Sequence, residues 1–200
     1  MIKIKITIAF LFVSILSNAQ DILSLEQAAY YIDNELDVPE DVTKIYDLNN
    51  TVDSFIGNWT GVYNGRTIVF RIYKTRVYNP YSEIEADYVN VKYDITDSSG
   101  NVVVSSAQSG LSEFRGISYG ADGFFELSLQ DACENTRNIY IKTAVPQQNH
   151  DILGAPKTEL QVIITQGSPQ GITSDPPDNS PCTSTADYLP NGAMLILNKV

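Results

Sequence analysis

Histidine, cysteine and basic residues are all scarce in this chain. The 200 residues include 1 His and 2 Cys, and 13 Lys and Arg stand against 24 Asp and Glu, for a formal net charge of −11. With so few His and Cys there is little material for a metal centre, and we expect no metal and no cofactor. Because an acidic chain repels phosphates, the composition also argues against nucleic acid as a partner.

Catalytic motifs are missing as well. The sequence has no Gly-x-Ser-x-Gly elbow and no glycine-rich phosphate loop. The single histidine, His150, lies in the polar stretch 147–151, which favours a solvated loop residue over a catalytic base. Since nucleophilic catalysis needs such a base, we expect a protein that is not an enzyme.

Residues 1–20 have the pattern of a secretory signal peptide. Lys3 and Lys5 precede an apolar run at 6–16, and small residues at 17–20 place the cleavage site near Ala19. A run this short cannot cross a hydrocarbon core of about 30 Å, and nothing later is apolar enough to do so. We therefore expect an exported protein, periplasmic or extracellular, that does not span a membrane.

The two cysteines, Cys133 and Cys182, are expected to form a disulfide, because an oxidising compartment favours their pairing. Closing a loop of that length would stabilise the fold by about 4 kcal/mol in the chain-entropy model. Two free thiols, or half of a metal site, remain as alternatives.

An acidic segment, residues 21–51, follows the signal peptide. Ser24 and Gln27 have the spacing of a capping box, and apolar residues recur at helical spacing up to Leu36, which predicts one short helix that ends before Pro39. Six carboxylates lie between Asp33 and Asp47. No Asp-x-Asp-x-Asp-Gly loop is present, which favours a solvated acidic segment over a calcium site.

From residue 52 onward, apolar residues alternate with polar ones. Hydrophobic residues make up 43% of the chain, which suits a single globular domain and argues against disorder. The alternation predicts strands near 55–63, 67–74, 89–95, 102–104, 113–119, 124–129, 138–143, 159–165 and 193–198. We expect an all-β domain over 52–200, an antiparallel up-and-down β-barrel of 8–9 strands with a β-sandwich as the alternative, and a proline-rich loop at 167–192.

The first predicted strand enters through Gly57-Asn58-Trp59, after a short helical turn that Asn50 could cap. This start resembles that of lipocalins and related calycin barrels, in which a Gly-x-Trp motif follows a short helix. In those families the Trp packs under a basic residue from the end of the chain. The resemblance implies a structural role for Gly57 and Trp59, with Lys199 as the basic residue.

A second resemblance covers nearly the whole chain. It rests on Tyr-Asp-Leu-Asn-Asn at 46–50, Phe-Ile-Gly-Asn-Trp-Thr-Gly at 55–61, Arg-Thr-Ile-Val-Phe at 66–70, Ala-Cys-Glu-Asn at 132–135 and Leu-Pro-Asn-Gly at 189–192. This order is similar to a family of small secreted proteins from flavobacteria and related Bacteroidetes, classed as a domain of unknown function. The resemblance implies an exported β-rich domain with a paired cysteine, and it carries over no catalytic residue.

The favoured function is that of a binding module. Six inward-facing residues could line a cavity for a small apolar molecule: Phe70, Ile72, Val89, Val91, Phe125 and Leu127. The same residues could instead fill a solid core, and the barrel would then bind through its loops, above all 167–192. A structural or surface protein that contacts a component of the cell envelope is a further alternative.

A glycan-active hydrolase is the alternative from another class. Glu83 and Glu85 would lie on one face of a strand, roughly 6.5–7 Å apart, near the carboxylate spacing of inverting glycosidases. A solubilising strand face accounts for both glutamates without catalysis, and we favour that interpretation.

Overall fold

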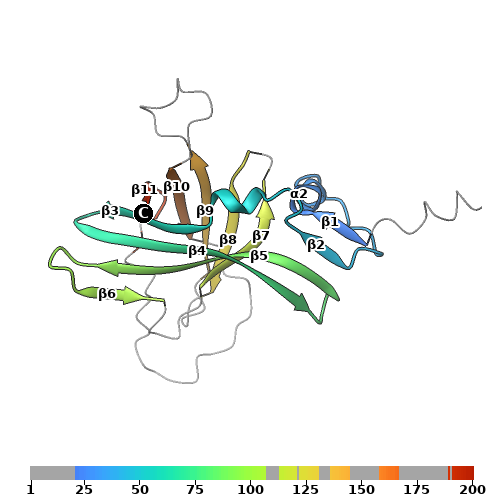
Figure 1. Ribbon diagram of the computed structural model, residues 1–200, viewed down its shortest axis with the longest axis horizontal. Helices are drawn as coiled ribbons and strands as arrows, with labels where there is room; N and C mark the ends of the chain where they lie inside the picture. Colours follow the sequence, from blue (N-terminus) through green and yellow to red (C-terminus); the bar gives the residue numbers. More distant parts are fainter. Residues whose placement is uncertain are drawn as a thin grey trace, which may run out of the picture.

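The computed structural model describes residues 21–106, 113–120, 122–130, 136–144, 158–166, 189 and 191–200. Within them the chain forms a closed antiparallel β-barrel of eight strands (Figure 1). The barrel strands are β3 (Gly57–Tyr63), β4 (Arg66–Asn79), β5 (Ile84–Thr96), β7 (Phe114–Tyr119), β8 (Phe125–Gln130), β9 (Thr136–Ala144), β10 (Glu159–Gln166) and β11 (Met194–Lys199). Each pairs with the next, and β11 pairs with β3 to close the sheet. The predicted up-and-down barrel is confirmed, and the closed sheet rules out the sandwich.

One short strand, β6 (Val102–Ser105), pairs with the end of β5 outside the barrel. The turn between them spans 97–101. Hydrogen bonds within the turn fix its conformation, because Asp97 Oδ1 accepts hydrogen bonds from the main-chain N–H groups of Ser99 and Asn101, both at 2.9 Å.

The segment before the barrel folds as β1 (Ile22–Ser24), α2 (Leu25–Asp33) and β2 (Lys44–Tyr46). The capping box is confirmed: Ser24 Oγ accepts Gln27 N–H at 3.2 Å, and Gln27 Oε1 accepts Ser24 N–H at 2.9 Å. The helix ends at Asp33, earlier than expected. Two strands of three residues each were not predicted, because a period of two cannot be recognised over so short a length.

The hairpin β4–β5 extends beyond the barrel. Its pairing runs from Thr67 opposite Thr96 to Asn79 opposite Ile84, whereas β3 reaches only Ile72 on β4. The start of β5 pairs in parallel with β2, and β2 with β1. The acidic segment is therefore continuous with the sheet, and it lies at one end of the barrel beside the hairpin (Figure 1).

Large apolar side chains fill the barrel interior. Phe70 contacts Tyr93 edge to face with ring centroids 6.4 Å apart, and Tyr93 contacts Phe114 at 5.7 Å. The other members of the core include Trp59, Ile68, Ile95, Ile139, Ile141, Leu160, Val162 and Ile164, all at 0% exposure.

Trp59 lies next to Lys199 in the closed barrel. The ring is fully buried, its Nε1 donates to the Phe55 carbonyl oxygen at 2.7 Å, and Lys199 Nζ lies 5.2 Å from the ring centroid. Gly57 has φ +133°, and a Cβ there would lie 3.1 Å from Lys199 Cε. A side chain at Gly57 would therefore be strained and would crowd the lysine.

The short helix before β3 is present as the 3-10 helix η1 (Thr51–Ser54), but Asn50 does not cap it. The cap is Asp47, whose Oδ1 accepts Thr51 N–H at 2.7 Å and whose Oδ2 accepts Val52 N–H at 3.3 Å. Asp47 is only 7% exposed. The expectation of a solvated carboxylate is therefore wrong for Asp47, because it satisfies buried main-chain donors.

Several predictions concern residues outside the described ranges: the signal peptide at 1–20, the pair Cys133 and Cys182, His150, and most of the loop at 167–192. They stay predictions. No helix in the described part of the chain has the length and apolarity needed to cross a membrane.

Candidate functional site

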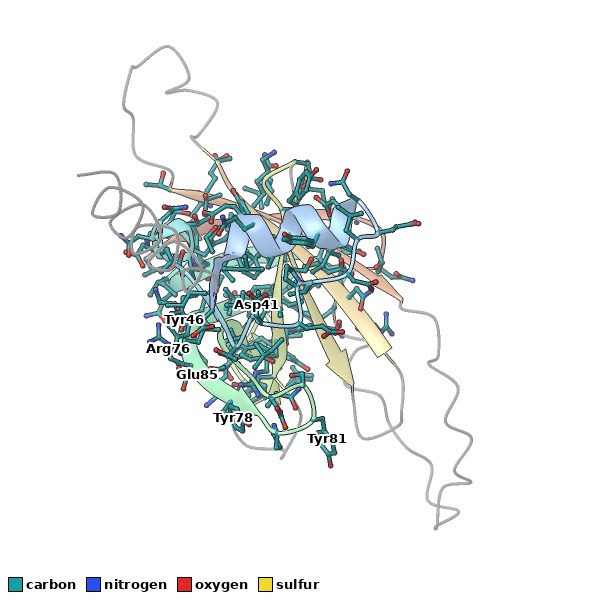
Figure 2. All side chains as sticks on the ribbon, turned by 90° about the vertical axis from the view of Figure 1, so that its right-hand side faces the viewer. Asp41, Tyr46, Arg76, Tyr78, Tyr81 and Glu85 are labelled. Atoms are coloured by element: carbon teal, nitrogen blue, oxygen red, sulfur yellow. The ribbon has the colours of Figure 1, made fainter. Side chains whose placement is uncertain are left out.

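The two candidate catalytic glutamates do not share a strand face. Glu83 lies in the turn before β5 with a left-handed backbone, φ 56°, whereas Glu85 lies within β5 (Figure 2). The Glu85 carboxylate accepts a hydrogen bond from the hydroxyl of Tyr46. The expected placement on one strand face is wrong because β5 begins at Ile84, which leaves Glu83 in the turn before it. The hydrolase interpretation loses the geometry on which it rested.

The charged side chains on the hairpin extension form hydrogen bonds and ion pairs with one another. Arg76 donates from Nε and Nη2 to Asp87 at 2.8 and 3.0 Å, and its guanidinium lies 3.7 Å from the centroid of the Tyr46 ring. Asp47 N–H donates to Asp87 Oδ2 at 3.0 Å, and Lys74 Nζ donates to Asp47 at 3.0 Å. These contacts attach β2 to the hairpin, where Tyr46, Arg76 and Glu85 lie close together (Figure 2).

The six residues proposed to line an internal cavity all face the interior. They are Phe70, Ile72, Val89, Val91, Phe125 and Leu127, none more than 3% exposed. They pack among the aromatic side chains of the core, and none of them lines the hollows described next. Binding of an apolar ligand between them stays a prediction.

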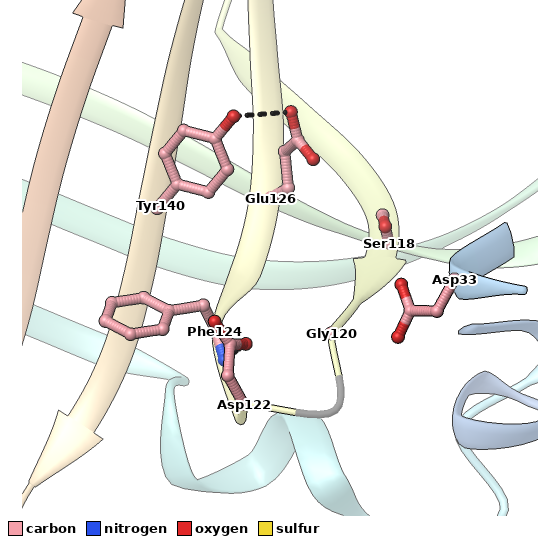
Figure 3. A pocket seen from close by; sticks show the side chains of 7 residues that line it. All are labelled: Asp33, Ser118, Gly120, Asp122, Phe124, Glu126 and Tyr140. Atoms are coloured by element: carbon pink, nitrogen blue, oxygen red, sulfur yellow. Dashed lines mark hydrogen bonds between the residues drawn. The ribbon is translucent and has the colours of Figure 1, made fainter. Parts of the chain in front are cut away.

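Three adjoining hollows lie on the outer surface between α2 and the strands β7 to β10. The first, of about 320 Å³, is lined by Asp33, Ser118, Gly120, Asp122, Phe124, Glu126 and Tyr140 (Figure 3). The second, of about 340 Å³, shares Asp33 and Gly120 and adds Glu26, Ala29, Tyr30, Asn34 and Tyr119. The third, of about 290 Å³, shares Asp122, Phe124 and Tyr140 and adds Ile163 and Thr165. Because they share lining residues, we describe them together as the outer groove.

Strand alternation builds the floor of the outer groove. Phe125 and Leu127 face the core, so Glu126 between them faces outward. The register places Glu126 between Ser118 on β7 and Tyr140 on β9, and it places Ile163 beside Tyr140 on β10. Four strands thus contribute one row of outward side chains.

The turn between β7 and β8 forms one wall of the outer groove. Gly120 N–H donates to the Phe124 carbonyl oxygen at 2.8 Å, and Asp122 Oδ1 accepts Phe124 N–H at 3.0 Å. Gly123 has φ +83°, a conformation that glycine adopts without strain. The hydrogen bond to Phe124 N–H holds Asp122 beside Phe124, and Asp33 at the end of α2 faces Asp122 from the other side (Figure 3).

Hydrogen bonds fix the orientation of the polar groups in the groove. Glu126 Oε1 accepts from the Tyr140 hydroxyl at 3.0 Å and from Asn138 Nδ2 at 3.2 Å. Partial burial, and then the hydrogen bond to the Glu126 carboxylate and its charge, raise the pKa of Tyr140 above its ordinary value. Tyr140 is therefore a neutral donor, and Glu126 is a fixed acceptor.

The charged side chains that line the outer groove are all acidic. Carboxylates of Glu26, Asp33, Asp122 and Glu126 line it, and no Lys or Arg is among the residues that line the three hollows. Burial, and then the charges of Glu26 and Asp122, raise the pKa of Tyr119 above its ordinary value. In the described part of the chain, no group of three or more His, Cys, Asp and Glu side chains has the arrangement of a metal site. The groove is suited to reversible binding through charge, hydroxyl and ring contacts.

None of these residues was a candidate from the sequence. The signal that could have found them is Phe124 and Tyr140, two aromatic residues at positions that the strand alternation turns toward solvent. The contribution of α2 could not be found in this way, because it depends on how the helix packs against β7.

No protein-family model, no curated protein and no solved structure matches this chain.

Proposed function

We propose that this protein is an exported, non-enzymatic binding module that holds its ligand or partner on the outside of the barrel, in the outer groove. One observation carries the proposal: three hollows adjoin on one outer face, whereas the described side chains of the interior pack against one another. Ligand sites are concave, and they combine apolar surface with a few placed polar groups. The outer groove has both.

The polar groups of the groove are held in fixed positions, as a binding site needs. The Glu126 carboxylate accepts hydrogen bonds from Tyr140 and Asn138, both at Oε1. These bonds fix its orientation, and Oε2 remains to accept a hydrogen bond from a ligand. Export is proposed from the cationic and apolar pattern of residues 1–20.

Nuclear magnetic resonance tests the location of the site. We would titrate ¹⁵N-labelled protein with three probes, a diamine (hexamethylenediamine), a neutral saccharide (maltohexaose) and a fatty acid (palmitate). We expect the amides of Phe124 and Tyr140 to shift with at least one of the first two probes, while those of Phe70 and Val91 do not move.

Three results would overturn the proposal. A palmitate adduct retained in native mass spectrometry, with shifts at Phe70 and Val91, would identify an internal carrier. Release of reducing ends from maltohexaose would identify an enzyme. If no probe shifts the groove amides, the groove is not a binding site.

A further inference from the structure

The outer groove is complementary in charge to a cation. Its four lining carboxylates belong to a chain of formal net charge −11, so the local charge and the overall field have the same sign. Glu126 accepts the hydrogen bonds from Tyr140 and Asn138 at Oε1 alone, so Oε2 remains to accept a hydrogen bond from a ligand. Carboxylate charge adds little to the binding free energy of a neutral saccharide, whereas an ammonium or guanidinium group forms charge-assisted hydrogen bonds with the carboxylates.

The chain already holds one ammonium group beside this groove. Lys142 Nζ donates to the main-chain oxygen of Asp122 at 2.5 Å and lies 5.0 Å from the centroid of the Phe124 ring. An aromatic face with an oxygen acceptor next to it is a general environment for cations. The aromatic rings of Tyr140 and Tyr30 line the same groove with their own carboxylate neighbours, and Tyr30 is 60% exposed.

The shape of the groove indicates an extended ligand. Its hollows follow one another from α2, across the turn between β7 and β8, to β10. Carboxylates line all three hollows, with Asp122 shared by the first and the third, and the third adds the apolar surface of Ile163. A ligand that uses the whole length needs several cations on a flexible backbone with apolar groups between them.

We infer that the outer groove binds a basic, extended segment of a polypeptide through Lys or Arg side chains. This inference rests on the proposed function and names the ligand class of the same site. The carboxylates supply charge-assisted hydrogen bonds, the tyrosine rings supply cation–π contacts, and Ile163 contacts the apolar part of the segment.

Fluorescence anisotropy with labelled hexalysine tests the ligand class, with hexaglutamate and maltohexaose as competitors. The test variant is Asp122→Asn with Glu126→Gln, two isosteric changes that keep the hydrogen-bond acceptors and remove two charges. We expect hexalysine to bind the wild type, to bind this variant about tenfold more weakly, and to be displaced by neither competitor. Circular dichroism checks that the variant folds.

A matched control separates the groove from the overall charge of the protein. Asp41→Asn with Glu83→Gln also removes two exposed carboxylates, and neither residue lines the groove. We expect this variant to bind hexalysine within about twofold of the wild type. Equal weakening in both double variants would overturn the inference, because binding would then follow net charge alone.

Failure of the inference can be told apart from failure of the proposed function. If maltohexaose shifts the groove amides of Phe124 and Tyr140 and hexalysine does not bind, the groove is a binding site for another class of ligand, and the inference is wrong. If no probe reaches the groove, both are wrong.

Discussion

Asp47 makes a buried ionic contact that joins η1 to the hairpin β4–β5. Its side chain is fully buried, and it accepts hydrogen bonds from Thr51 N–H at 2.7 Å, Val52 N–H at 3.3 Å and Lys74 Nζ at 3.0 Å. In Asp47→Asn one oxygen remains, but the ion pair with Lys74 is lost, and an amide NH₂ faces a donor. We expect this change to lower the free energy of unfolding by about 2 kcal/mol, a value reduced because the Lys74 side chain is 31% exposed.

Asp53 is the matched control, because it faces the same lysine from solvent. Its Oδ1 lies 3.7 Å from Lys74 Nζ, and its side chain is 63% exposed. Asp53→Asn removes the same charge, and we expect it to change stability by less than about 0.5 kcal/mol. The difference between the two variants therefore measures burial and capping rather than charge.

Urea denaturation followed by the fluorescence of Trp59 suits this comparison, since Trp59 is the single tryptophan and is fully buried. With a urea dependence of about 2 kcal/mol per molar, Asp47→Asn should move the midpoint down by about 1 M. Equal shifts for the two variants, or no shift for Asp47→Asn, would refute the structural role assigned to this carboxylate.

Three further predictions concern acid stability, strand packing and the cysteines. Burial raises the pKa of Asp87, but hydrogen bonds, first from Arg76, outweigh it and hold the pKa below its ordinary value. The resulting stability is present above the unfolded-state pKa of about 3.9 and is lost as the pH falls through the folded-state value, so Asp87→Asn should flatten the fall of the urea midpoint below about pH 4. A Cβ at Gly116 would lie 2.1 Å from a main-chain oxygen of β8, so Gly116→Ala should cost more than about 2 kcal/mol in the same assay, and an unchanged midpoint would contradict the pairing of β7 with β8. Replacing Cys133 and Cys182 by Ser should cost about 4 kcal/mol if they are bonded, and a thiol assay that finds two free thiols in the denatured, unreduced protein would refute the disulfide.

Strands and caps of short range could be predicted from the sequence, because their causes lie within a few residues. The alternation at Ile68, Phe70 and Ile72 places those side chains in the core whatever the partner strand is. The capping box of Ser24 and Gln27 closes over three residues. Trp59 and Lys199 could be linked only through the resemblance to lipocalins, and the closing pair of β11 with β3 brings them together.

Other features depend on contacts between residues that are distant in the chain, and only the tertiary structure reveals them. From the sequence, Asp47 is one of six acidic residues predicted to be solvated, and only the fold brings it to Lys74, 27 residues away. The position of Glu83 depends on where the hairpin turns, and alternation does not mark that residue. The outer groove combines α2 with β7 through β10, and no local pattern encodes how a helix packs on a barrel. Local hydrogen bonding and alternation thus determine the barrel, whereas the binding surface arises from long-range packing, which depends on all of its elements at once.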